Sequence, residues 1–160
     1  MLRYKILIIL FLIPIAVLGK KMGPLPEIYN PDSFLVHDGY VYLSDMNSVH
    51  IHRLADLKKI KKFVKKGDGP AEFVSPPKLK IYGGKLLVYN AYKYAWFDLS
   101  GNYVSEKRMP FIVIDFGCVG NNYILTTIKE AKKATSENYS IAITVCKGFN
   151  GEMKTISSLK

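Results

Sequence analysis

The stretch Gly67-Asp68-Gly69-Pro70-Ala71-Glu72-Phe73 separates two segments of the chain that follow the same pattern. Before it, apolar runs lie at residues 41–43 and 49–54, and after it similar runs lie at residues 86–88 and 94–99. Glycine allows backbone angles with positive φ, and proline fixes φ and has no amide hydrogen to donate. We therefore expect the stretch to end one sheet and to set the angle at which the next sheet begins.

From residue 34 onward the sequence predicts short strands separated by turns. The first cycle has strands at residues 34–36, 40–43, 49–54 and 60–64. The second cycle has strands at residues 80–82, 85–89, 94–99 and 103–106. A looser third cycle has strands at residues 114–119, 123–128, 140–146 and 153–157, with an insertion at residues 129–138.

The second cycle repeats the first at a spacing of 45 residues, which separates Gly39 from Gly84 and Leu54 from Leu99. A period of about 40 to 50 residues with four strands per unit is typical of propeller blades. In the strand at residues 85–89, the four residues after Lys85 are apolar at consecutive positions, which indicates a strand buried on both faces. The sequence therefore predicts an all-β protein with about three four-stranded antiparallel blades, at about residues 34–73, 74–110 and 111–160.

The same residues resemble a known family of propellers. The resemblance is carried by residues 67–73, by Pro76, by Leu-Leu-Val-Tyr-Asn at 86–90 and by Trp-Phe-Asp-Leu-Ser-Gly-Asn-Tyr at 96–103. These motifs resemble those of six-bladed β-propellers of bacterial secreted proteins, which are similar to NHL-repeat and TolB-like propellers. The sequence departs from the family's pattern at Ala71, where glycine is usual. The resemblance implies a structural motif between blades made of Gly67, Asp68, Gly69, Pro70, Glu72 and Phe73.

Three blades make only half of a six-bladed ring. An open half-ring would expose the apolar faces of its terminal blades, and repeat arrays need their ends covered. Three alternatives stay open: a fragment of a longer protein, a homodimer that closes a six-bladed ring, and a ring completed by another chain. In each case we expect that residues 20–160 alone do not remain a well-behaved monomer.

The composition fits one folded domain. The chain has 160 residues, of which 49% are hydrophobic, so a packed core is expected rather than disorder. Its formal net charge of +10 would suit nucleic acid, an anionic membrane or an acidic polymer as a partner.

The N-terminus predicts export. Arg3 and Lys5 precede an apolar run at residues 6–18, and a cleavage site is expected just before Lys20. The run is short for a membrane-spanning helix, which needs about 20 residues. We interpret residues 1–19 as a signal helix, with an uncleaved membrane anchor or a buried helix as alternatives, and residues 20–33 as a lead-in segment. A periplasmic or secreted location argues against nucleic acid as a partner.

A group of lysines lies around the fourth predicted strand. One interpretation is contact with an anionic glycan or lipid surface. The other is protection of an unpaired sheet edge, which the position at an outer strand favours. The group consists of Lys58, Lys59, Lys61, Lys62, Lys65 and Lys66.

Two residue pairs have the chemistry of a metal site or a disulfide. His50 and His52 lie at i and i+2 and share one face of a strand, but no cysteine or carboxylate lies at ligand spacing beside them. We therefore expect ordinary strand histidines and no metal site. Cys118 and Cys146 are expected on the first and third strands of one blade, about 9.5 Å apart, a distance that argues against a disulfide.

No arrangement of catalytic residues is evident, whether a Ser-His-Asp pattern, a nucleophile elbow or a glycine loop for phosphate. Short polar side chains at turns and strand ends are expected to cap those turns, namely Asp45, Asn47, Asn90 and Asp98. We expect no catalytic residue and no cofactor. The favoured function is an extracytoplasmic module that binds a protein or a glycan. The alternative is part of a propeller-type hydrolase or lactonase with its site in a central channel.

Overall fold

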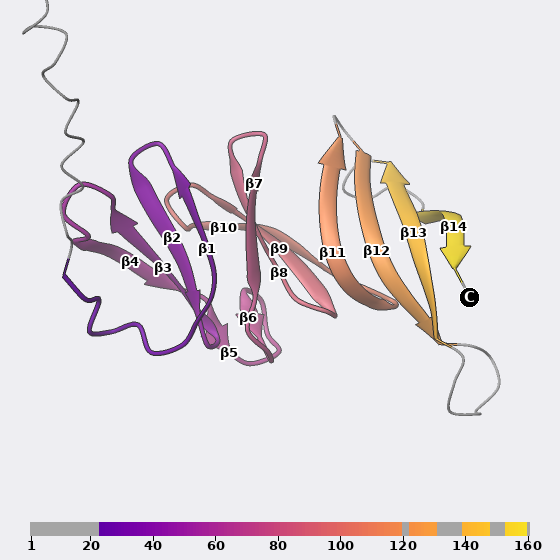
Figure 1. Cartoon of the computed structure of the whole chain (residues 1–160), viewed down its shortest axis with the longest axis horizontal. Coiled ribbons are helices and arrows are strands. Elements are labelled where there is room, and N and C mark those ends of the chain that lie inside the picture. Colours follow the sequence, from indigo (N-terminus) through magenta and orange to yellow (C-terminus); the bar gives the residue numbers. More distant parts are fainter. Residues whose placement is uncertain (1–22, 120–121, 131–138, 148–152, 160) are drawn as a thin grey trace, which may run out of the picture.

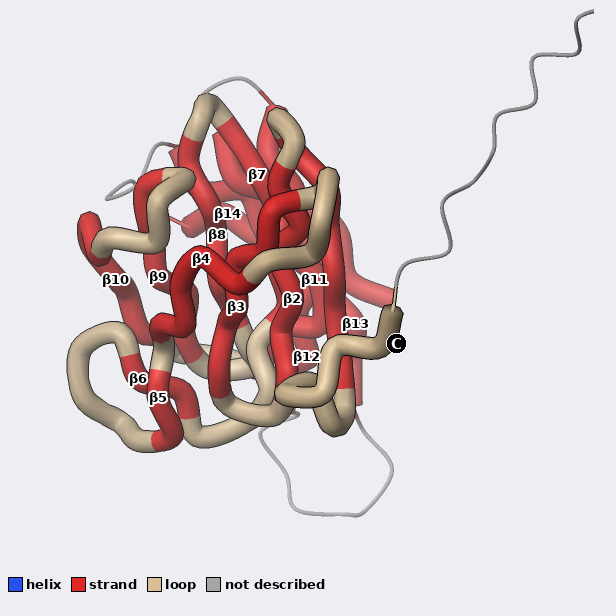
Figure 2. The backbone as a smooth tube through the Cα atoms, turned by 90° about the vertical axis from the view of Figure 1, so that its left-hand side faces the viewer, coloured by secondary structure: helices blue, strands red, loops and turns tan. Residues whose placement is uncertain are grey.

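The described strands form three four-stranded sheets that stand side by side along the long axis of the molecule (Figure 1). The structure is a computed structural model that describes residues 23–119, 122–130, 139–147 and 153–159. In these residues the regular elements are strands, and none of them is a helix (Figure 2). No helix in the described ranges is therefore long and apolar enough to cross a membrane. The predicted signal helix at residues 1–19 lies outside them.

Each sheet is a meander in which sequence neighbours pair in antiparallel fashion. The first sheet contains β1 (Pro31–His37), β2 (Tyr40–Asp45), β3 (Ser48–Arg53) and β4 (Lys59–Phe63). The second contains β7 (Lys78–Tyr82), β8 (Lys85–Tyr89), β9 (Lys93–Asp98) and β10 (Tyr103–Arg108). The third contains β11 (Ile112–Val119), β12 (Asn122–Glu130), β13 (Tyr139–Lys147) and β14 (Met153–Leu159). Between the first two sheets, β5 (Lys65–Lys66) and β6 (Glu72–Phe73) form a short parallel pair.

The predicted strands of all three cycles are present, and their ends differ from the prediction by a few residues. Successive four-stranded antiparallel meanders with packed faces are the architecture of propeller blades, so the protein has a propeller-like all-β fold. The fold prediction is thus confirmed.

Equivalent tight turns fix the first hairpin of the first two sheets. Asp38 and Gly39 have φ of 46° and 76°, and Gly83 and Gly84 have φ of 53° and 69°. Positive φ at both central residues defines the type I′ turn, whose twist matches that of the flanking strands. The repeat of 45 residues therefore corresponds to a repeated hairpin.

Two apolar clusters lie between the sheets, and β8 contributes to both. Leu86 and Val88 pack in the cluster between the first and second sheets, whereas Leu87 and Tyr89 pack in the cluster between the second and third sheets. Successive side chains of a strand point to opposite faces, so a strand covered on both faces must be apolar at consecutive positions. Phe73 belongs to the first cluster and is 1% exposed, which confirms that it is buried between the first two sheets.

The two ends of this stack differ. On the face of the first sheet that points away from the second, Val41, Leu43, His50 and His52 are all buried. Residues 23–30 of the lead-in segment contact this face, where the carboxylate of Asp45 accepts hydrogen bonds from two of their backbone amides. The face is open at β1, because Phe34 and Val36, which pair with Leu43 and Val41, are 72% and 52% exposed.

The outer face of the third sheet lacks such a cover among the described residues. Ile141 and Ile143 on β13 are 46% and 40% exposed, and they pair across the sheet with Ile128 and Thr126. The opposite face of the same strands, with Leu125 and Ala142, is buried toward the second sheet. Exposed apolar side chains therefore lie on the outer faces of both terminal sheets, and the first of these faces is covered in part by residues 23–30.

Candidate functional site

The loop that joins the first two sheets closes on itself through its own backbone. Gly67 N–H donates to the carbonyl of Phe73 at 3.3 Å, and the amide of Glu72 donates to the carbonyl of Gly69 at 3.1 Å. Ala71 has φ of 57°, the left-handed conformation in which the family pattern has glycine. At Gly69 the reason for glycine is steric. A Cβ there would lie 3.1 Å from a carboxylate oxygen of Glu72.

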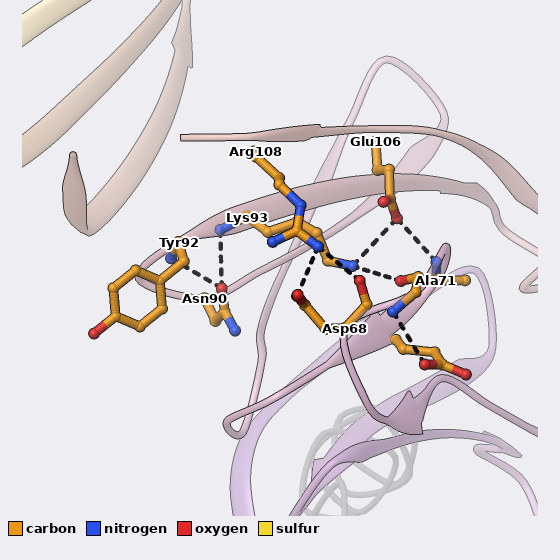
Figure 3. Close-up of polar contacts among 9 residues, drawn as sticks. Asp68, Ala71, Asn90, Tyr92, Lys93, Glu106 and Arg108 are labelled. Carbon is orange, nitrogen blue, oxygen red and sulfur yellow. Dashed lines mark hydrogen bonds and ion pairs between the residues drawn. The ribbon is translucent and has the colours of Figure 1, made fainter. Parts of the chain in front are cut away.

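A buried ion pair from the second sheet holds this loop (Figure 3). Lys93, only 4% exposed, donates from Nζ to the carbonyl of Gly69 at 2.9 Å and lies 3.4 Å from Glu106 Oε2. The same oxygen of Glu106 accepts the amide hydrogen of Ala71 at 2.9 Å. Lys93 Nζ also lies 4.9 Å from the centre of the Phe73 ring, within range of a cation–π interaction.

A second, exposed ion pair lies beside the first. Arg108 donates to Oδ1 of Asp68 at 2.8 Å and to its carbonyl at 2.7 Å. This hydrogen bond lowers the pKa of the Asp68 carboxyl. The motif residues are thus engaged with one another and with β9 and β10, which makes the loop a joint between sheets rather than an open binding site.

The short polar side chains at turns cap backbone groups, as expected. Asn90 Oδ1 accepts the amide hydrogens of Tyr92 and Lys93 at 3.0 and 2.9 Å. Asp98 accepts the amide hydrogen of Asn102 at 2.8 Å, and Asn47 donates to the carbonyl of Phe73 at 3.0 Å. These four side chains, Asp45 included, are therefore used within the fold.

The structure places the lysine group on an edge of the first sheet. Lys59, Lys61 and Lys62 belong to β4, the last strand in the sheet order, and Lys65 and Lys66 form β5. Lys61 is bound to Asn102 Oδ1 at 2.7 Å and Lys59 to Glu27 at 3.1 Å. The other four, Lys58, Lys62, Lys65 and Lys66, are exposed.

The structure brings a carboxylate to the histidine pair that sequence spacing did not suggest. His50 and His52 are buried on the outward face of the first sheet, and ligand atoms of Glu27, His50 and His52 lie within 4.8 Å of one another. Burial, then the nearby Lys62 and Lys59, lower the pKa of His50, so its imidazole is neutral at pH 7. Glu27 lies far upstream in the lead-in segment, where no spacing rule links it to a strand.

A hydrolase, the alternative function, would need a pocket for its substrate. A groove lies between β1 and β7. This groove has a volume of about 290 Å³, and its polar lining side chains are His37, Lys80 and Tyr82. Lys80 is bound to Asp115 Oδ1 at 2.7 Å, and His37 lies 3.2 Å from the carboxylate of its neighbour Asp38. The groove lining therefore offers no pair of nucleophile and base.

The two cysteines lie where the strand prediction puts them. In the register of the third sheet, Cys118 on β11 and Cys146 on β13 both pair with Tyr123 on β12. The two cysteines form no disulfide, and burial raises the pKa of Cys118 to about 11. Cys118 is thus a protonated, unreactive thiol at neutral pH.

No protein-family model matches this sequence, and no curated protein matches it either. Among solved structures, the chain is similar to the WD40 domain of Pan2 from Neurospora crassa, with 8% identity and a TM-score of 0.49 over 81% of this chain and 49% of that one. The N-terminal domain of Nup159 gives 18% identity and a TM-score of 0.46, over 84% of this chain and 32% of that one. The WD40 domain of SCAP from fission yeast gives 11% identity and a TM-score of 0.44, over 80% and 32%. The chain thus spans about half the length of the first structure and about a third of the other two.

Proposed function

We propose that this chain is a protein-binding propeller module that uses the outer face of its third sheet. The single observation that carries the proposal is the exposure of apolar side chains on this face. Ile141 and Ile143, on the outer face of the third sheet, are 46% and 40% exposed. An apolar sheet face of this kind is characteristic of an interaction surface.

The occupant that fits this face is another β-sheet. In this molecule, each sheet face that carries apolar side chains toward a neighbour is covered by the next sheet of the stack. The outer face of the third sheet continues that arrangement with Ile124, Ile141, Ile143 and Val145, which lie on adjacent strands. A partner that presents a sheet face would extend the stack and bury these side chains.

The test uses the full-length protein alone, so that a second copy is the available sheet face. We expect concentration-dependent self-association at 0.15 M salt, measured by light scattering after size exclusion. Glutamate at both Ile141 and Ile143 should abolish the association, because it places charges in the apolar contact. Ile60→Glu is the matched control, since Ile60 is 48% exposed on the edge strand β4. A wild-type monomer at all concentrations, or equal effects of the control and the double variant, would contradict the proposal.

The place and type of this module are further parts of the proposal. The basic residues Arg3 and Lys5 before the apolar run support export to the periplasm or the exterior. Fusion of residues 1–25 to a reporter tests this part, and a reporter retained in the cytoplasm would refute it.

The left-handed conformation of Ala71 supports an NHL-repeat or TolB-like type of propeller, because the family pattern has glycine there. The exposed lysines at the edge of the first sheet support an anionic glycan as an additional ligand.

A further inference from the structure

We propose that Glu27, His50 and His52 form a binding site for a divalent transition-metal ion, with Zn²⁺ as the best fit. The ion would fasten the lead-in segment to the outward face of the first sheet. The proposal rests on three features: which ring nitrogens are unprotonated, the burial of those nitrogens, and the carboxylate that faces them.

The hydrogen bond of His52 fixes its tautomer. Its Nδ1 lies 2.9 Å from the carbonyl oxygen of Leu57, which only accepts hydrogen bonds, so Nδ1 carries the proton. Nε2 therefore presents a lone pair. This atom is buried without a hydrogen-bond partner, and it lies 3.8 Å from Oε1 of Glu27.

The hydrogen bonds of Ser48 fix the tautomer of His50. The hydroxyl of Ser48 donates its hydrogen to the carbonyl of Asp45 at 3.0 Å, so toward His50 Nε2, also at 3.0 Å, it acts as an acceptor. Nε2 of His50 therefore carries the proton, and Nδ1 presents a lone pair. That Nδ1 is likewise buried without a hydrogen-bond partner.

Both histidines thus have the arrangement that metal-bound histidines show. One ring nitrogen donates to a protein oxygen, which fixes the tautomer and the ring orientation, and the other nitrogen is unprotonated. Buried polar atoms without partners are rare, because burial removes their hydrogen bonds to water. Because ligand atoms of Glu27, His50 and His52 lie within 4.8 Å of one another, a single bound cation would give both rings a partner.

The donor set selects the ion. Two imidazoles and one carboxylate suit Zn²⁺, and they leave a fourth position of a tetrahedral site for water. Ligand atoms of such a site lie about 3.3 Å apart, given bonds of about 2.0 to 2.1 Å. The ligand atoms here lie within 4.8 Å of one another, so the site closes by a small shift of the half-exposed Glu27 side chain toward the rings.

The positive charges of two lysines on β4 would repel a cation at the proposed metal site. Lys59 Nζ lies 3.1 Å from Glu27 Oε2, and Lys62 pairs with His50 across the sheet. A metal ion would take over the Glu27 carboxylate, and the exposed ammonium of Lys59 would move into solvent. Removal of the Lys59 charge should therefore strengthen metal binding, an effect that a purely structural histidine pair does not predict.

The main experiment is calorimetric titration of the full-length protein with Zn²⁺ after removal of bound metals with a chelator. We expect one ion per chain. Glu27→Gln and His52→Gln should each weaken binding at least about 10-fold, by analogy with the effect of changes around metal sites. Lys59→Gln should strengthen it about 3-fold or more, because a competing positive charge is lost. His37→Gln is the matched control and should change affinity less than 2-fold, since His37 lies on β1 outside the cluster.

A second measurement reports on the lead-in segment. Bound Zn²⁺ should slow hydrogen exchange at the amides of Tyr29 and Asn30, which bind the carboxylate of Asp45 beside the site. X-ray absorption at the zinc edge should show two imidazoles. Absence of saturable binding by the folded wild-type protein would overturn the proposal, as would equal weakening by Glu27→Gln and His37→Gln. Because Glu27 is half-buried and lies in the lead-in, its variant keeps the test valid even where a histidine variant fails to fold.

Discussion

At the scale of single residues, Ala71 shows how one side chain is strained by its place in the joint. Its φ is 57°, and in this conformation its amide donates to Glu106 Oε2, 2.9 Å away. An L-residue in the left-handed region costs about 1 to 2 kcal/mol, because Cβ approaches the following carbonyl oxygen. The contact with Glu106 persists in spite of this cost.

We expect Ala71→Gly to stabilise the protein. Relief of the left-handed strain outweighs the loss of about 0.4 to 1 kcal/mol that glycine's freedom in the unfolded chain brings. The net gain should be about 0.5 to 1 kcal/mol in the free energy of unfolding. Urea denaturation measures it as a higher midpoint with an unchanged slope. Ala91→Gly is the control and should lower stability, because Ala91 has no positive φ; a loss at both positions would contradict the prediction.

Asp115 joins the first strands of the second and third sheets, and its titration should be visible in stability. Burial alone would raise its pKa, but hydrogen bonds from Lys80 at 2.7 Å and Tyr89 at 2.8 Å outweigh burial and hold the pKa at about 2. The ordinary value is 3.8, so the carboxylate stabilises the fold above about pH 4. This stabilisation is lost as the pH falls from about 4 to about 2.

Substitution of this carboxyl gives the measurement. The difference in unfolding free energy between the wild type and Asp115→Asn should shrink as the pH falls from 5 to 3. Because the side chain is half exposed, we expect a change of about 1 kcal/mol at most. Asp56→Asn, at an exposed ion pair with Arg53, should show a weaker trend. A difference that does not vary with pH would mean that Asp115 contributes through packing rather than charge.

At the scale of elements, strands and turns follow from sequence because their causes are local. Residues 86–89 are apolar at every position because each face of β8 packs in a different cluster, and the turn at Gly83-Gly84 needs glycine because φ is positive at both residues. The joint was recognised from its motif, but its partners Lys93 and Glu106 were not. They lie on other strands, and only the packing of the sheets brings them to the loop.

The lead-in segment is the element whose role the sequence concealed. Its described residues 23–30 form neither a helix nor a strand. That it contacts the first sheet depends on hydrogen bonds between residues well separated in sequence, such as that from the amide of Asn30 to Asp45 at 2.6 Å. Glu27 reaches the histidines for the same reason.

Asp45→Ala should loosen the lead-in segment without disturbing the sheets. The carboxylate is nearly buried and accepts the amides of Tyr29 and Asn30, so its loss leaves these donors without their partner. We expect a loss of about 1 to 3 kcal/mol in stability. Hydrogen exchange at these two amides should accelerate while that of Val49 in β3 stays slow. Asp32→Ala, at an exposed position in β1, is the control, and equal acceleration in both variants would contradict this role.

At the scale of the whole molecule, the number of sheets was predictable and their unequal ends were not. The repeat of 45 residues and the consecutive apolar strands predicted three stacked blades. Whether a terminal face is covered depends on which segment docks there. No periodicity in residues 23–30 indicated that they would contact the first sheet.

The cluster between the first and second sheets also bears on how the chain folds as it leaves the ribosome. Its members extend from Leu35 to Leu99, so the first sheet obtains its packed partner only after the second has been synthesised. Until Leu79, Leu86 and Val88 emerge, the first sheet lacks the side chains of the second sheet against which it packs. During synthesis the first sheet therefore exposes the apolar face that later packs against the second sheet, and a chaperone would bind such a face. A pause during translation of the second sheet would prolong this exposure.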